Sequence, residues 1–177
     1  MIIYLVGFMG SGKSTLGRHL AKYLNYKFID LDALFVLKEK IKIHEFFEKY
    51  GESAFRKTEY ELLRQIDLSN NLIVATGGGT PCYSNNMDYM RDTGITVFLQ
   101  LEASLLCKRL INSHTIRPMV IGKTKEELET WAEEMVNKRA EYYKKAHVII
   151  DARNLSTALL VEVLSPYIST ASSSDSV

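Results

Sequence analysis

The first fifteen residues, MIIYLVGFMGSGKST, constrain the fold more than any other part of the chain. Residues 2–6 form an apolar run of β-forming residues that is too short for a helix, which predicts a buried parallel strand. Residues 7–14 then match the pattern G-x-x-x-x-G-K-[ST] without a gap. A chance match in a chain of this length occurs on the order of once in a hundred chains. An amphipathic helix pattern follows, so the stretch predicts a strand, a phosphate-binding loop and a helix.

The residue types of this loop suit a nucleoside triphosphate bound with Mg²⁺. Glycines let the backbone turn so that successive N–H groups point at phosphate oxygens, and the start of the helix adds its positive dipole end. Lys13 reaches the β- and γ-phosphates, and the Ser14 hydroxyl ligates Mg²⁺ directly. A glycine-rich turn without a ligand is the structural alternative. The residues predicted to bind the nucleotide here are Gly10, Ser11, Gly12, Lys13, Ser14 and Thr15.

Composition limits the remaining possibilities. The chain has 177 residues, of which 46% are hydrophobic and 24% charged, as in an ordinary globular domain that can bury a substantial core. A net charge of +1 argues against nucleic-acid or membrane partners. No apolar stretch approaches the length of a membrane span, and the N-terminus lacks the basic region of a signal peptide. We expect a cytoplasmic, monomeric protein.

Two carboxylates, Asp30 and Asp32, follow a predicted second strand over residues 26–29. Residues i and i+2 of an extended segment point to the same side, so both carboxylates project from the end of the strand where open α/β sheets bind ligands. The functional interpretation places one near Mg²⁺ and one on the acceptor. The structural alternative is that Asp32 caps a helix that starts at Ala33. Local sequence does not decide between them.

Three consecutive glycines, residues 77–79, directly follow a third apolar strand over residues 72–75. Their conformational entropy is costly, so we interpret them as a place where the backbone closely approaches a ligand. This strand does not end in the acidic residue that often accompanies such a loop. Asp30 is therefore the candidate carboxylate to reach Mg²⁺ through water.

The remaining sequence alternates further strands and helices. Residues 32–67 have a helical pattern broken near Gly51, with an apolar stripe of Ile43, Phe46, Phe47 and Tyr50 predicted as core. Arg56 and Glu59 lie one turn apart and could be a surface ion pair.

Two later segments lack a regular pattern. Residues 112–123 have no clear periodicity and are a lid candidate. Residues 169–177 form a serine-rich tail that is predicted to be disordered.

Five strands that alternate with helices predict a three-layer α/β/α fold with a parallel sheet, the architecture of P-loop kinases. No Asn-Lys-x-Asp sequence is present, which disfavours a GTPase, and no acidic strand end supports a motor ATPase. Phosphoryl transfer to a small molecule is the leading class.

In order and spacing, five signals resemble the shikimate kinase family over residues 1 to about 168. They are residues 7–15, Asp30-x-Asp32, Phe55-Arg56-x-x-Glu59, the triple glycine, and Arg117-Pro118 followed by Lys138-Arg139-x-x-Tyr142-Tyr143. The resemblance implies one domain over residues 1–168 of the nucleoside-monophosphate-kinase-like architecture, with strand order 2-3-1-4-5. It also implies a substrate-binding segment at about 32–61 and a lid at about 112–123. The implied activity is ATP-dependent phosphorylation of the shikimate 3-hydroxyl, in the pathway to chorismate and aromatic amino acids, with Mg²⁺ as cofactor.

The resemblance also implies roles for single residues. Asp32 contacts the acceptor hydroxyls, and Lys13 and Arg117 stabilise the transferring phosphate. The shikimate carboxylate is clamped by Arg56 and Arg139 with the backbone of Gly78 and Gly79, while Arg109 and Arg153 flank the adenine. Planar guanidinium groups suit a carboxylate because they bind it through two hydrogen bonds. The chain departs from the family in having Glu141 where proline is usual, and one extra residue between Arg109 and Arg117.

Two other functions stay open at this point. A gluconate-kinase-like enzyme of the same architecture would phosphorylate another small hydroxyl compound, but Arg56, the triple glycine and Arg139 discriminate against it. A non-catalytic, nucleotide-gated binding module would tolerate loss of Asp32, but gives no reason for a second anion site.

Overall fold

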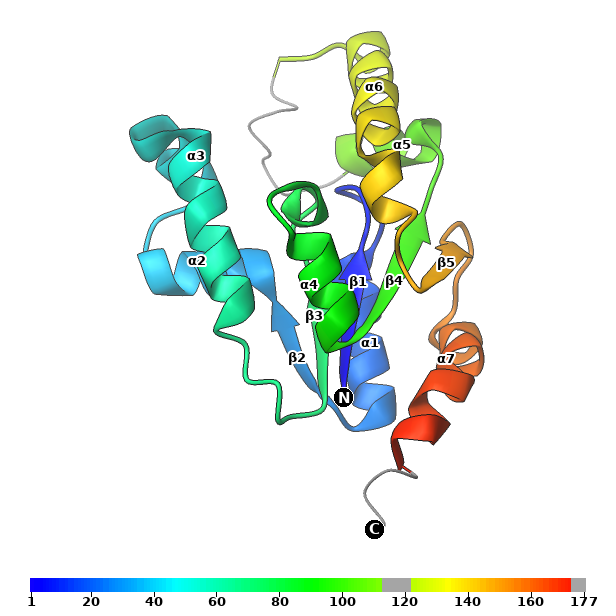
Figure 1. Ribbon diagram of the computed structural model, residues 1–177. Helices are drawn as coiled ribbons and strands as arrows, with labels where there is room; N and C mark the ends of the chain where they lie inside the picture. Colours follow the sequence, from blue (N-terminus) through cyan, green and yellow to red (C-terminus); the bar gives the residue numbers. More distant parts are fainter. Residues whose placement is uncertain (113–121, 173–177) are drawn as a thin grey trace.

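The computed structural model describes residues 1–112 and 122–172, and in this part a five-stranded parallel sheet organises the chain (Figure 1). The order of the strands is β2-β3-β1-β4-β5, which confirms the predicted order. β1 lies at the centre, with Ile3 paired to Ile73 of β3 and to Ile95 of β4. The strands are β1 (Ile2–Val6), β2 (Lys27–Asp30), β3 (Leu72–Ala75), β4 (Ile95–Gln100) and β5 (Val148–Asp151).

Helices connect the strands and cover the sheet. Between β1 and β3 lie α1 (Lys13–Leu24), α2 (Leu31–Glu39) and α3 (Ile43–Arg64). The short helix η1 (Thr80–Cys82) and α4 (Asn86–Thr93) follow β3, and then come α5 (Ala103–Ile111), α6 (Lys125–Tyr143) and α7 (Thr157–Ser172). None of the helices in the described part of the chain is both long and apolar enough to cross a membrane.

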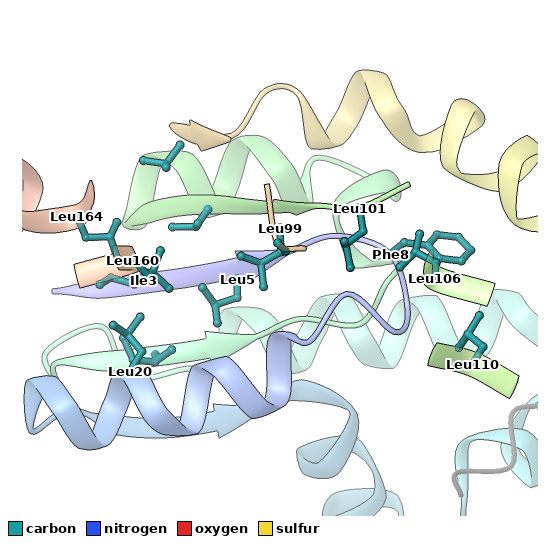
Figure 2. Packing of buried hydrophobic residues seen from close by; sticks show 14 of the residues in the cluster. Ile3, Leu5, Phe8, Leu20, Leu99, Leu101, Leu106, Leu110, Leu160 and Leu164 are labelled. Carbon is teal, nitrogen blue, oxygen red and sulfur yellow. The ribbon is translucent and has the colours of Figure 1, made fainter. Parts of the chain in front are cut away.

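The core divides into two clusters on opposite faces of the sheet because side chains alternate along each strand. In β1, Ile3 and Leu5 join side chains of α1, α5, α6 and α7. Figure 2 shows this cluster, with Leu20 of α1 and Leu160 of α7 close to the strand. Tyr4 belongs to the other cluster, with side chains of α2, α3 and α4. These three layers confirm the predicted α/β/α fold.

The region after β2 differs in part from the sequence prediction. The expected break at Gly51 is present inside α3, where this residue has φ 78° and ψ 172°. A second break, at Lys40 with φ 55°, separates α2 from α3 and was not predicted. Tyr50 was predicted as core but is 51% exposed, because its ring packs on the outer side of the buried Phe46 ring, 4.7 Å away.

The last helix extends further than the sequence predicted. The helix α7 continues to Ser172, although a disordered tail was expected from residue 169. A serine-rich composition is a weak guide here, because serine, threonine and alanine can all extend a helix that is already packed. Residues 113–121, which include Arg117 and most of the predicted lid, lie outside the described residues, as do residues 173–177.

Candidate active site

The phosphate-binding loop joins β1 to α1 and lies at the carboxyl end of the sheet (Figure 1). Gly10 and Gly12 have φ of 82° and 100°, a region that favours glycine, and Gly12 is the N-cap of α1. The first residue of the helix, Lys13, is only 8% exposed. Its Nζ donates hydrogen bonds of 2.8 Å to the carbonyl oxygens of Gly7 and Phe8. The loop backbone thus holds a buried ammonium group beside the N-terminus of a helix.

A cleft of about 920 Å³ opens over this loop. Arg109 from the end of α5 lies across it, with its guanidinium 3.4 Å from the carbonyl oxygens of Gly10, Ser11 and Ala152. Arg153 follows β5 and pairs with two carboxylates. Its Nη2 lies 2.6 Å from Asp151 Oδ2, and its Nη1 lies 3.7 Å from Glu102 Oε1. These two carboxylates raise the pKa of Arg153. The cleft lining includes every residue predicted from the loop to bind the nucleotide, with Asp30, Asp32, Gly78, Arg109 and Arg153.

Asp30, the last residue of β2, and Asp32, two residues later, have different local roles. Oδ1 of Asp30 accepts from the N–H groups of Asp32 and Ala33 at 3.1 and 3.2 Å, so Asp30 caps α2. The structural alternative, in which Asp32 caps a helix that starts at Ala33, is therefore wrong because the helix begins earlier, at Leu31. Asp32 lies in the first turn of α2 and lines the cleft.

The pair formed by Arg56 and Glu59 is buried, although the sequence allowed a surface ion pair. Arg56 Nη1 donates to Glu59 Oε2 at 2.9 Å, and the two side chains are 15% and 3% exposed. Thr80 Oγ1 donates to the other oxygen of Glu59 at 2.5 Å, which joins α3 to η1. Burial raises the pKa of the Glu59 carboxyl, while Arg56 acts in the opposite direction. This second region, the Arg56 cluster, consists of Arg56, Glu59, Thr80, Glu52 and Tyr83.

The triple glycine lies between the Arg56 cluster and the phosphate-binding loop. A Cβ atom on Gly79 would be 2.7 Å from Arg56 Nη2, and one on Gly78 would be 3.1 Å from the backbone nitrogen of Met9. A Cβ on Gly77 would be 2.7 Å from Glu59 Oε1 and 3.0 Å from Asp32 Oδ1. The close backbone approach expected here is thus an approach to protein atoms of both regions. Contact with a ligand stays a prediction.

Arg139 reaches the same glycines from α6. Its side chain is buried, with Nη1 3.4 Å from the carbonyl oxygen of Gly78 and the guanidinium over the Phe8 ring. The hydroxyl of Tyr143, one turn later, donates to the same carbonyl oxygen at 2.5 Å. The helix is continuous past Glu141, the position at which the family usually has proline. The structure therefore brings Arg139 and Arg56 to adjacent glycines.

Sequence reasoning missed several participants in this region. Tyr83 lies in an irregular stretch without periodicity, so no local signal marked it. Thr80 follows the triple glycine but carries no spacing signal. Glu52 lies four residues before Arg56 on a predicted helix, and that spacing alone could have indicated an ion pair.

A parallel 2-3-1-4-5 sheet, a phosphate-binding loop at its carboxyl edge and acidic residues in the adjoining cleft define a P-loop kinase. The family model for shikimate kinase matches residues 9–168, and the chain belongs to this family. It is accordingly an ATP-dependent phosphotransferase, which decides against a non-catalytic binding module. The same comparisons favour shikimate kinase over the gluconate-kinase-like alternative.

Individual relatives cover nearly the whole chain. The curated shikimate kinase of Azobacteroides pseudotrichonymphae genomovar. CFP2 is 36% identical over 167 residues, which cover 94% of this chain and 98% of the relative. The crystal structure of shikimate kinase from Bacteroides thetaiotaomicron matches with a TM-score of 0.89 and 36% identity. The match covers 93% of this chain and 98% of the Bacteroides chain. Shikimate kinase from Acinetobacter baumannii in complex with shikimate has a TM-score of 0.82 and 34% identity, with 93% of each chain covered.

Proposed function

We propose that this enzyme transfers the γ-phosphoryl group of ATP to the 3-hydroxyl of shikimate, giving shikimate 3-phosphate and ADP in the pathway to chorismate and aromatic amino acids. The observation that supports this most strongly is the pairing of two arginines beside the nucleotide cleft. Arg56 and Arg139 approach Gly79 and Gly78, whose backbone also borders the phosphate-binding loop. A nucleotide site alone does not need this second cationic region, whereas an acceptor that carries a carboxylate does.

The phosphate-binding loop supplies the nucleotide side of the reaction. Backbone N–H groups of Gly10, Ser11, Gly12, Ser14 and Thr15 and the Lys13 ammonium would bind the phosphates, with Arg109 and Arg153 flanking the adenine. Ser11 supports a polar ligand in the loop: its buried Oγ has no hydrogen-bond partner among the described residues.

The residues present also fit Mg²⁺. The Ser14 hydroxyl and the Asp30 carboxylate line the same cleft, and oxygen atoms are the ligands that Mg²⁺ prefers. The cap of α2 uses only Oδ1 of Asp30. Ser14 would be a direct ligand and Asp30 would act through water. Bound there, Mg²⁺ would supply positive charge that offsets the negative charge developing during transfer.

Asp32 is the residue placed to orient the acceptor hydroxyl. Its carboxylate lines the nucleotide cleft and lies against Gly77, whose other neighbour is Glu59 of the Arg56 cluster. Asp32 is thus between the two regions. Phosphoryl transfer depends mainly on positioning and charge stabilisation, so an acceptor of the hydroxyl hydrogen bond at this point serves as orienter or weak base.

The role of Arg117 rests on the resemblance alone, because the residue lies outside the described part of the chain. We propose that it stabilises the transferring phosphate as part of a lid over residues 112–123. The single domain over residues 1–168, the monomeric state, the cytoplasmic location and the absence of nucleic-acid and membrane partners also stay predictions.

An acceptor panel tests the proposed function. ADP release is followed in a coupled assay with Mg·ATP and shikimate, quinate or gluconate, and the product is identified by phosphorus NMR. We expect shikimate to give a kcat/KM at least about 100-fold above gluconate, a difference of about 2.7 kcal/mol in transition-state binding. Removal of Mg²⁺ with a chelator should abolish turnover. Faster turnover of gluconate, or phosphate at a position other than the 3-hydroxyl, would overturn the proposal.

A further inference from the structure

Two carboxylates of the chain already hold Arg56. Its Nη1 donates to Glu59, while Nε and Nη2 both donate to Oε1 of Glu52, at 3.3 and 3.2 Å. The Nε and Nη2 groups form one of the two edges through which a guanidinium binds a carboxylate with paired hydrogen bonds. Glu52 therefore occupies an edge of Arg56 that suits a substrate carboxylate.

Glu59 and Glu52 hold the guanidinium in different surroundings. Glu59 is 3% exposed and fixed by Thr80, whereas the Glu52 side chain is 53% exposed. Glu52 also follows Gly51 directly, at the break within α3. Of the two, Glu52 is the carboxylate that can leave Arg56, because its side chain is already half exposed to water and its contact with Arg56 is that of a surface ion pair.

Tyr83 holds Glu52 in its place on Arg56. The Tyr83 hydroxyl donates to Glu52 Oε1 at 2.5 Å, and its ring lies 4.0 Å from the Arg56 guanidinium carbon. This hydrogen bond is the main reason why the pKa of Glu52 is lowered. Tyr83 comes from the segment after η1, so the contact ties the start of the second half of α3 to the triple-glycine region.

The charges around Arg56 do not favour a further anion while both carboxylates are in place. The Arg56 guanidinium itself has two carboxylates, Glu52 and Glu59, within 3.3 Å, and Arg139 is the second positive charge that acts on Glu52. A substrate carboxylate that binds the same guanidinium adds a third negative charge, and like charges at this separation repel. The repulsion falls if the substrate carboxylate replaces Glu52.

We propose that Glu52 competes with the carboxylate of the acceptor substrate for Arg56, and so sets the affinity of the enzyme for that substrate. The inference rests on the proposed function, since it assigns the role of Arg56 to carboxylate binding. Glu52 mimics the substrate carboxylate on the Nε and Nη2 edge, and Tyr83 strengthens the internal contact. Binding of shikimate then exchanges one carboxylate for another.

The variant Glu52→Gln tests the competition, because it keeps the size of the side chain and removes the charge that Arg56 binds. We expect KM for shikimate to fall at least threefold, with kcat and KM for ATP within twofold of wild type. Glu48→Gln is the matched control, because this exposed glutamate lies four residues earlier in α3. The KM of the Glu48→Gln enzyme for shikimate should stay within 1.5-fold of wild type. Shikimate methyl ester, which lacks the anionic carboxylate, should show no gain in Glu52→Gln.

Tyr83→Phe gives a second, independent measurement. It removes the hydroxyl that donates to Glu52 but keeps the ring against Arg56, so KM for shikimate should fall by less than in Glu52→Gln.

A raised or unchanged KM for shikimate in a folded Glu52→Gln enzyme would overturn the inference and show that Glu52 positions Arg56 or is neutral. A gain of equal size with the methyl ester would also overturn it. If the wild-type enzyme does not phosphorylate shikimate at all, the proposed function fails, and the inference fails with it.

Discussion

The nucleotide cleft and the Arg56 cluster are adjacent, yet they are built in different ways. The cleft takes its central feature from one continuous segment, in which backbone geometry at Gly10 and Gly12 and carbonyl contacts to Lys13 form the loop. The Arg56 cluster is assembled from side chains of α3, η1 and the segment that follows it. A continuous segment of backbone can be recognised from sequence. A cluster of charges from distant segments becomes visible only once the chain is folded.

The difference also concerns energy. In the loop, backbone carbonyl oxygens hold the Lys13 ammonium. A buried ion pair such as Arg56 and Glu59 stabilises the protein only while both side chains are present. Removal of one partner from such a pair commonly costs about 3–5 kcal/mol. For variants of the cluster, effects on folding must therefore be separated from effects on substrate binding.

The largest expected effect is in the nucleotide cleft. Lys13→Ala should lower kcat by about 100-fold or more, because it removes the charge that we propose stabilises the transferring phosphate. The melting temperature should change little, since Lys13 is not a member of either core cluster and its Nζ donates to carbonyl oxygens of the loop. Steady-state kinetics at saturating Mg·ATP measure the effect, with Lys22→Ala, an exposed lysine of the same helix, as control. A near-normal kcat would show that the loop is not the catalytic site.

Asp32→Asn probes the junction between the two regions. Because Asp30 caps α2, the substitution leaves the cap intact and removes the charge that would accept the hydrogen bond of the acceptor hydroxyl. We expect kcat to fall by about 100-fold, the lower range for loss of a positioned acid or base, with an unchanged midpoint of urea unfolding. Full activity in this variant would exclude Asp32 from the reaction.

Gly79→Ala should affect the acceptor side alone. The added methyl group would lie 2.7 Å from Arg56 Nη2, so the guanidinium must move. Overpacking of this kind costs about 1–3 kcal/mol, which corresponds to a rise in KM for shikimate of about 5- to 150-fold if the cost falls on binding. KM for ATP, measured in the same preparation, should stay within about twofold. An equal rise in both constants would mean that the two regions are not separable.

The smallest expected effect concerns the support of the Gly78 carbonyl. Tyr143→Phe removes the hydroxyl that donates to this oxygen, while the Arg139 contact remains. A neutral hydrogen bond contributes about 0.5–1.5 kcal/mol, so KM for shikimate should rise by a few-fold. Burial raises the pKa of Tyr143, so the hydroxyl stays protonated and the change should not depend on pH between 6 and 9. Tyr142→Phe is the control, and an effect mainly on KM for ATP would contradict this role.

Sequence predicted the fold and the nucleotide cleft well because their signals are local. Strands such as β3 were recognised from short apolar runs, and the loop from the spacing around Lys13. The strand order came from the family resemblance, since nothing local specifies which strands are neighbours. The extra break at Lys40 was missed, because a lysine with positive φ has no signal in composition or periodicity.

The acceptor region was predicted only in part. Arg56 and Arg139 were assigned together through the resemblance, and the structure brings both to the triple glycine. Burial of the Arg56–Glu59 pair was not predictable, because spacing along a helix does not reveal which face another element covers. Tyr83 was missed for the same reason: its contacts to Glu52 and Arg56 cross 31 and 27 residues of sequence, respectively, and depend on how η1 packs on α3.

The most direct test of the central claim is to compare the two Michaelis constants in enzymes that lack one arginine of the acceptor side. Arg139→Ala and the double variant Arg56→Ala with Glu59→Gln are used, because the second removes the buried pair as a whole. A charge-assisted hydrogen bond contributes about 1.5–3 kcal/mol, so KM for shikimate should rise about tenfold or more in each variant. KM for ATP should stay within about twofold of wild type. A large rise in KM for ATP with an unchanged KM for shikimate would place these arginines in the nucleotide site and contradict the account.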